Sequence, residues 1–303
     1  MIKSVKVTNY MGASLTIPLI WNGGPFEIKK IEGLGPPTAN INTTEIATND
    51  GSKFNSARAS QRNVVLYLLF HPYPTIEDTR QLSYKYFPVK KTLQLEIETD
   101  NRRCVVVGYP ESNAPNIFSE NEDCQISIIC PNPYWESSGS GGERTVVFHG
   151  TVPAFEFPFS NESLTESVIE FGIIERKRQN NVYYDGDAEQ GMTMVIESIG
   201  TVKNLTIHNL KTREKMRIDH DALVSFTGSG IVDGDTITIS TVKGHKTIEL
   251  LRKGVTTNIL NCIGKDDDWF QLSKGDNQIG FTADEGSDYL DFKVMYYSLY
   301  EGV

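Results

Sequence analysis

The sequence has few basic residues and no long apolar run. It contains 29 Lys and Arg residues against 39 acidic residues, which gives a formal net charge of −10. This balance argues against a surface built to neutralise phosphates, because such a surface needs clustered cations. No run of about 20 apolar residues is available to span a membrane, and the N-terminus has no apolar stretch long enough for a signal peptide. We therefore expect a protein that is made in the cytoplasm and does not enter a membrane.

Cysteine is also scarce, with four residues at positions 104, 124, 130 and 262. Cys124 and Cys130 lie six residues apart in an expected strand, so they share one face at a separation of about 20 Å and cannot bond to each other. No CxxC or Cys/His spacing is present, which argues against a zinc site. We expect all four thiols to be reduced and buried.

The common catalytic motifs are missing. The sequence contains no G-x-S-x-G, no glycine-rich loop before Lys-Ser or Lys-Thr, and no H-E-x-x-H. We therefore expect no catalytic residue and no cofactor. Asp185–Glu189 and Asp266–Asp268 can be interpreted as calcium loops or as solvated turns, and we favour turns and no metal. A glycan hydrolase on a β scaffold stays an alternative, since an all-β protein offers many possible carboxylate pairs.

Alternation of apolar and polar residues dominates what is present. Leu93, Leu95 and Ile97 alternate with polar residues, as is typical of a half-exposed strand, whereas Val64–Phe70 is apolar on both faces. The exception is residues 76–87, where Thr75 is a suitable N-cap and Pro88 stops the pattern. The pattern predicts an all-β fold with one helix near 76–87.

A short segment rich in serine and glycine divides the chain. Residues 137–143 have the composition of a linker and follow a proline-containing strand end. Beyond them, turn signals recur every 8 to 12 residues, as in a β-sandwich. We therefore predict an N-terminal domain over 1–136, a linker over 137–143 and a second β-sandwich over 144–303. The second domain includes an expected turn at Gly275–Asn277 and a final strand over Asp288–Tyr300.

An ordered set of segments resembles the distal tail protein of long, non-contractile-tailed bacteriophages. The set covers nearly the whole chain and comprises Ile31–Pro37, Asp50-Gly51, Arg62–Leu68, Arg80 with Tyr84–Phe87, Gly108–Glu111, Gln125–Trp135, Glu214–Asp219, Gly234-Asp235, Trp269–Leu272, Gly275–Asn277 and Tyr300–Val303. The run Cys130-Pro131-Asn132-Pro133-Tyr134-Trp135 is the most specific.

The resemblance implies a ring-forming N-terminal β-sandwich with one helix, followed by a galectin-like β-sandwich. It also implies a homohexameric ring in the virion. That ring would join the tail tube to tail-tip or baseplate proteins, such as a tail-associated lysin or a receptor-binding protein, and let DNA pass without specific binding. The resemblance implies no catalytic residue and no cofactor.

Two surface hypotheses follow. The polar, turn-rich region 38–54 and the segment before it can be an arm that reaches a neighbouring subunit, or an ordinary surface hairpin. The candidate ring-contact residues are Gly33, Leu34, Gly35, Pro36, Pro37, Asn40, Asn42, Asp50 and Gly51. As an alternative function, the second domain can bind host-surface polysaccharide, with Trp269 as the stacking residue.

Overall fold

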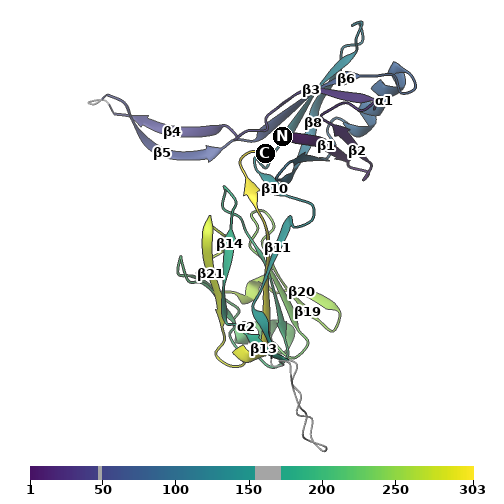
Figure 1. The fold of residues 1–303 in the computed structure, drawn as a ribbon. Helices are drawn as coiled ribbons and strands as arrows, with labels where there is room; N and C mark the ends of the chain where they lie inside the picture. The colour runs from purple at the N-terminus through teal and green to yellow at the C-terminus, as the bar shows by residue number, and fades with distance from the viewer. Residues whose placement is uncertain (47–49, 154–171) are drawn as a thin grey trace, which may run out of the picture. The chain divides into compact units, whose positions relative to one another are not determined.

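The computed structural model describes residues 1–46, 50–153 and 172–303 (Figure 1). The chain divides into two compact units. Unit 1 comprises Met1–Glu143 and Ser298–Val303, and unit 2 comprises Arg144–Tyr297. Neither helix in the described residues is long and apolar enough to cross a membrane.

Unit 1 is a β structure with one helix. Its elements are β1 (Ile2–Asn9), β2 (Ser14–Pro18), β3 (Phe26–Glu32), β4 (Ala39–Glu45), β5 (Ser52–Ala59), β6 (Arg62–Phe70), α1 (Ile76–Tyr86), β7 (Leu93–Thr99), β8 (Arg103–Pro115), β9 (Asp123–Cys130), β10 (Trp135–Ser137) and β23 (Leu299–Tyr300). The main sheet has the order β2-β1-β7-β8-β9-β6-β3.

The long strand β8 joins two halves of this sheet. Residues 103–108 pair with β7, and residues 109–115 pair with β9. Val7 and Leu95 from one half belong to the same buried core as Leu66 and Ile126 from the other, so both halves enclose one core. The result is the expected β-sandwich, with the proline-containing strand β2 at an edge.

Helix α1 forms where the sequence predicts it. The Thr75 side chain accepts a hydrogen bond from the Asp78 N–H at 3.1 Å, and Asp78 in turn accepts one from the Thr75 N–H at 3.2 Å. This capping box satisfies two backbone donors at the start of the helix. The helix buries Thr79 and Ser83 and ends before Pro88.

Unit 2 packs two sheets around a second core. Its elements are β11 (Glu143–Val147), β12 (His149–Pro153), β13 (Gly172–Arg176), β14 (Gln179–Tyr184), β15 (Thr193–Ser198), β16 (Thr206–Asn209), β17 (Glu214–Arg217), α2 (His220–Thr227), β18 (Thr236–Ser240), β19 (Thr247–Arg252), β20 (Val255–Asn258), η1 (Leu260–Cys262), β21 (Gly275–Thr282), η2 (Ser287–Tyr289) and β22 (Leu290–Tyr297). The sheets have the orders β11-β22-β15-β18-β19-β20 and β14-β21-β16-β17, and β12 pairs with β13.

Four expectations that bear on the second half of the chain are wrong. The expected strand Asp288–Tyr300 is divided, because β22 joins unit 2 whereas β23 pairs with β10 in unit 1. Residues 298–303 therefore belong to unit 1 and not to a domain over 144–303. Gly275–Asn277 is the start of β21 and not a turn. Helix α2 is an additional helix, capped by Asp219 and Gly228.

The placement of β23 predicts that Tyr300 stabilises unit 1. Tyr300 is buried in the core of unit 1 and its ring lies 4.3 Å from the Arg102 guanidinium carbon. Replacing Tyr300 with Ala should destabilise unit 1 by about 3 kcal/mol through loss of buried aromatic contacts. Hydrogen exchange should show reduced protection of the amides in β8 and β10. As a control, replacing the exposed residue Tyr10 with Ala should change the free energy of unfolding by less than about 1 kcal/mol. Faster exchange in unit 2 alone would contradict this assignment.

Candidate assembly surface

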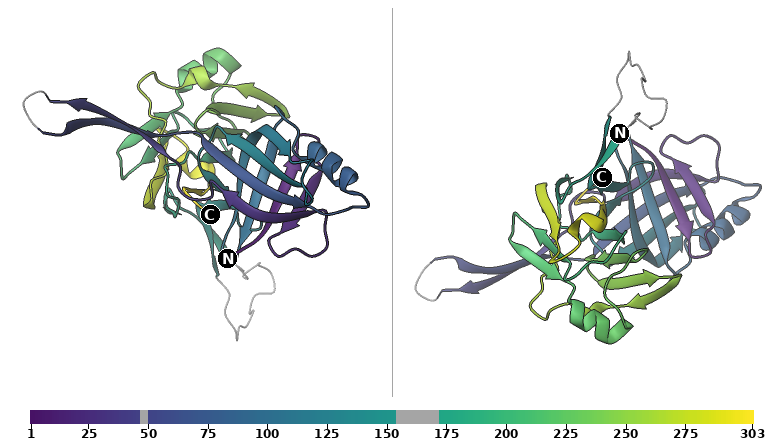
Figure 2. Two further views of the ribbon diagram at one scale, coloured as in Figure 1. Left: turned by 90° about the horizontal axis from the view of Figure 1, so that it is seen from above. Right: turned by 90° about the horizontal axis from the view of Figure 1, so that it is seen from below.

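The expected arm is a hairpin of two strands that extends away from the rest of unit 1 (Figures 1 and 2). β4 pairs with β5 from Ala39 opposite Ala59 to Glu45 opposite Ser52, and these two strands form a sheet of their own. Every residue of the two strands is exposed except Ala59, which is half-buried. Residues 47–49 lie outside the described residues. We call residues 39–59 the arm.

The two faces of the arm differ in chemistry. Thr43 lies opposite Phe54, and Ile41 lies two residues before Thr43 in the same strand, so Ile41 and Phe54 share one face. Their side chains are 63% and 61% exposed, which leaves this apolar face uncovered. The other face carries Asn42, whose amide lies 3.5 Å from the Ser56 hydroxyl. An isolated two-stranded hairpin is only marginally stable in water, so an arm with these faces is suited to being covered by a neighbour.

Arg62 holds the base of the arm. It is only 3% exposed. Its guanidinium donates hydrogen bonds to the carbonyl oxygens of Gly33 and Gly35, to that of Pro133 at 2.7 Å and to that of Glu301 at 2.6 Å. Burial lowers the pKa of this guanidinium. The charge is compensated by four carbonyl dipoles and by the Trp135 ring, 5.4 Å from the guanidinium carbon.

The backbone at the arm's base allows little variation. Gly33 has a φ of +82°, and a Cβ at this position would lie 2.0 Å from the Asn63 carbonyl oxygen. The Ser60 N–H donates to the Thr38 carbonyl at 2.8 Å and closes the hairpin. The Val303 N–H donates to the Leu34 carbonyl at 3.1 Å, which adds a second contact with the last residues. The arm therefore has a fixed base and an uncovered length.

The candidate residues divide into two groups. Gly33, Leu34 and Gly35 meet at Arg62 and the last residues of the chain, and Pro36 and Pro37 continue into the arm. Asn40 and Asn42 lie on the polar face of β4, and Asp50 and Gly51 lie immediately before β5. Sequence reasoning missed Arg62 itself, and its position at the start of a strand that is otherwise apolar was the available signal.

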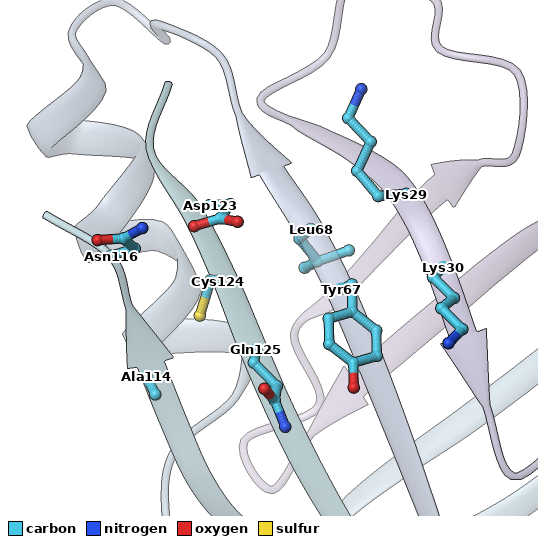
Figure 3. A pocket seen from close by; sticks show the side chains of 9 residues that line it. All are labelled: Lys29, Lys30, Tyr67, Leu68, Ala114, Asn116, Asp123, Cys124 and Gln125. Carbon is cyan, nitrogen blue, oxygen red and sulfur yellow. The ribbon is translucent and has the colours of Figure 1, made fainter. Parts of the chain in front are cut away.

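Besides β2, two edges of the main sheet have no strand partner among the described residues. β3 ends the strand order on one side, and no strand of the described residues pairs with the outer side of β8 between residues 111 and 115. A pocket lies across the strands between these edges (Figure 3). It is lined by Lys29, Lys30, Tyr67, Leu68, Ala114, Asn116, Asp123, Cys124 and Gln125. Lys30 lies with its amine 5.7 Å from the Tyr67 ring centre.

The acidic segments considered as calcium loops have local partners. Asp267 accepts hydrogen bonds from the Gly264 N–H at 2.7 Å and the Arg217 N–H at 3.1 Å, and Asp185 pairs with Arg144 at 2.6 Å. Within the described part of the chain, no three His, Cys, Asp or Glu side chains are grouped as a metal ion requires.

The cysteines are free and buried, as expected. Burial raises the pKa of Cys104 and Cys130 to about 11 and that of Cys124 to about 12, and it also raises the pKa of Cys262. Because the thiolate is the reactive form, these thiols are chemically inert at neutral pH.

Trp269 is partly covered by other groups of unit 2. It is half-buried against the core of unit 2, and the Lys246 amine lies 5.2 Å from its ring centre. A sugar that stacked on the covered face would have to displace this lysine. We expect Trp269→Ala to destabilise unit 2 by about 2 kcal/mol without removing any binding to host polysaccharide. Loss of binding on a glycan array with an unchanged melting temperature would contradict this expectation.

Removal of the Arg62 guanidinium should loosen the base of the arm. Arg62→Met leaves four carbonyl groups without their donor and should lower the free energy of unfolding by about 3 kcal/mol. Arg62→Lys should restore only part of this loss, since an ammonium does not reproduce the planar set of five donors. Limited proteolysis should show faster cleavage near residues 33–37 in both variants, with Arg58→Met, in the exposed arm, as the control. Equal cleavage rates in all proteins would show that Arg62 does not hold this segment.

The fold is similar to that of one solved phage protein. The sequence matches no family model and no curated protein. The structure is similar to that of the Dit (gp 19.1) protein of phage SPP1, described as a paradigm of the hub adsorption apparatus of phages that infect Gram-positive bacteria. The TM-score is 0.66 at 10% identity, over 97% of this chain and 98% of the SPP1 protein.

Two further structures are of the phage P2 baseplate in its activated conformation, with Ca and with Sr. They match at TM-scores of 0.49 and 0.46 and identities of 13% and 11%, over 97% and 98% of this chain and 98% of each matched chain, and these scores are too low to add to the fold assignment. The chain shares its fold with the SPP1 protein over nearly its whole length, and the expected all-β, β-sandwich fold is confirmed.

Proposed function

We propose that this chain is the distal tail protein of a long, non-contractile-tailed phage. In this role six copies form a ring at the tail tip, which joins the tail tube to baseplate or tail-tip proteins such as a tail-associated lysin or a receptor-binding protein. The likeness to the SPP1 hub protein from end to end is the observation that carries the proposal. The chain acts as a structural part of the virion and not as an enzyme, after synthesis in the host cytoplasm.

The arm supports self-assembly. In the single chain, the apolar face of the arm exposes Ile41 and Phe54 to water, and Arg62 fixes the base of the arm. Covering this face by a neighbouring copy removes apolar surface from water, at about 25 cal/mol for each Å². If the arm of each copy binds one surface of the next copy, the contacts run head to tail and close into a ring when the rotation between copies allows it.

The sheet edges support the same geometry. β3 and the outer side of β8 lie at opposite ends of the strand order β8-β9-β6-β3. An exposed sheet edge invites pairing with another chain unless something covers it, and in a ring each edge is covered by the next copy. The net charge of −10 suits a conduit, because an acidic wall repels DNA that passes through. We therefore expect DNA to cross the ring without specific contacts.

The oligomeric state and the role of the arm can be tested together. Native mass spectrometry and negative-stain imaging of the purified chain should show rings of six copies. Replacing residues 40–58 with a two-residue Asn-Gly turn keeps the cross-strand pair of Ala39 and Ala59 at the base of the arm. This variant should give folded monomers. The paired substitutions Ile41→Ser and Phe54→Ser should weaken the ring similarly, whereas Asn40→Ser and Asn42→Ser on the opposite face provide the matched control.

A chain that stays monomeric at high concentration, and also in the presence of tail-tube protein, would overturn the proposed ring. Rings that persist without the arm would leave the hub function intact and assign the contact to another surface. Binding of host polysaccharide by a strictly monomeric protein would instead support the alternative function, a carbohydrate-binding module.

A further inference from the structure

The connection between β8 and β9 carries an exposed phenylalanine on a well-held loop. Phe118 is 96% exposed, and Ile117 beside it is 44% exposed. The loop is fixed at its base, since Arg80 donates two hydrogen bonds to the Glu122 carboxylate at 2.8 and 3.1 Å. The Asn116 N–H also donates to the Asp123 carbonyl at 2.9 Å. Phe118 is therefore a large apolar side chain presented to solvent by an ordered hairpin.

The opposite edge of the sheet carries an exposed apolar surface. Trp21 stacks on His71 with a distance of 4.1 Å between ring centres and an interplanar angle of 24°. Two hydrogen bonds hold this pair, from Trp21 Nε1 to the Gly24 carbonyl and between His71 Nε2 and Glu27, each at 2.9 Å. Trp21 is still 42% exposed and Ile20 is 74% exposed.

Both features lie at the same end of the strands. Phe26, at the start of β3, lies opposite Phe70, and His71 follows directly. Leu69 lies opposite Asp123, and the loop with Phe118 comes just before Asp123. The loop and the Trp21–His71 stack thus lie at the same end of the strands but on opposite sides of the strand order β8-β9-β6-β3.

A ring brings these edges together in a consistent direction. β8 is antiparallel to β9, β9 to β6 and β6 to β3, so β8 and β3 run in opposite directions. When β8 of one copy meets β3 of the next, the antiparallel alternation continues. The loop with Phe118 then lies beside the Trp21–His71 stack of the neighbour.

Backbone pairing alone is a poor way to fix this contact. Pro110 and Pro115 remove two N–H donors from the β8 edge, and the Pro110 carbonyl already accepts a hydrogen bond from the Lys90 N–H. The charges favour the same orientation of neighbouring copies, because Asp123 lies on the β8 side of the sheet whereas Lys29 and Lys30 stand on β3 (Figure 3). Each lysine already pairs with a carboxylate of its own chain, so an apolar contact has to set the register.

We propose that Phe118 of each copy packs on the Trp21–His71 stack of the next copy and sets the register of the ring. This inference rests on the proposed ring but names a contact separate from the arm. It explains why a fixed loop exposes Phe118 and why the opposite edge exposes an indole that its own chain leaves half uncovered. Aromatic side chains that meet in this way are typical anchors of protein interfaces.

Cysteine cross-linking tests the contact directly. The double variant Ile117→Cys with Ile20→Cys, which leaves Phe118 and Trp21 in place, is treated with a short bis-maleimide after ring assembly and should give a ladder of covalent oligomers up to six copies. Each single variant should give no ladder, since the native thiols are buried and inert. If native mass spectrometry shows rings but the double variant gives no ladder, the contact is wrong and the ring stands. If no ring forms under any condition, both proposals fail.

Substitutions at Phe118 supply a second readout. Phe118→Asp should raise the concentration needed for ring assembly by about tenfold or more, whereas Phe118→Leu should retain most of the assembly. Both variants should keep the melting temperature of the single chain, because the side chain is almost fully exposed. Unchanged ring assembly by the Asp variant would overturn the proposed contact.

Discussion

The buried guanidinium of Arg62 connects three parts of unit 1 that are far apart in the sequence. It binds the segment before the arm, the turn before β10 and the residues after β23 through four carbonyl oxygens. A buried charge without such partners would cost several kcal/mol. The position of the arm's base and the closure of the unit 1 core therefore depend on the same side chain.

The structure combines rigid supports with uncovered apolar groups. The arm exposes Ile41 and Phe54, the loop between β8 and β9 exposes Phe118, and the edge near β3 exposes Trp21. In each case hydrogen bonds to the backbone or to a charged partner hold the supporting segment in place. Ordering a flexible segment on binding costs conformational entropy. The Phe118 loop and the Trp21–His71 stack are already held in the single chain and avoid much of this cost, which suits assembly into the proposed ring.

Local patterns in the sequence predict the local structure of this chain well. Alternation identifies most strands, and Thr75 and Pro88 mark the helix, because capping and side-chain periodicity act between near neighbours. The pattern cannot tell which sheet a strand joins, so β22 and β23 look like one strand although Ser298 separates two units. Arg62 was missed for a related reason. Its partners lie 27 to 239 residues away, and no local pattern reports them.

The order of synthesis adds a consequence of this long-range closure. Unit 2 is inserted between β10 and β23, so the chain completes residues 144–297 before it supplies the last strand of unit 1. Until residue 301 is made, Arg62 lacks its Glu301 acceptor and β10 lacks its partner Tyr300. The base of the arm is thus complete only in a chain that already contains unit 2. The proposed contacts between copies, in so far as they depend on this base, would therefore be restricted to chains whose two units are both present.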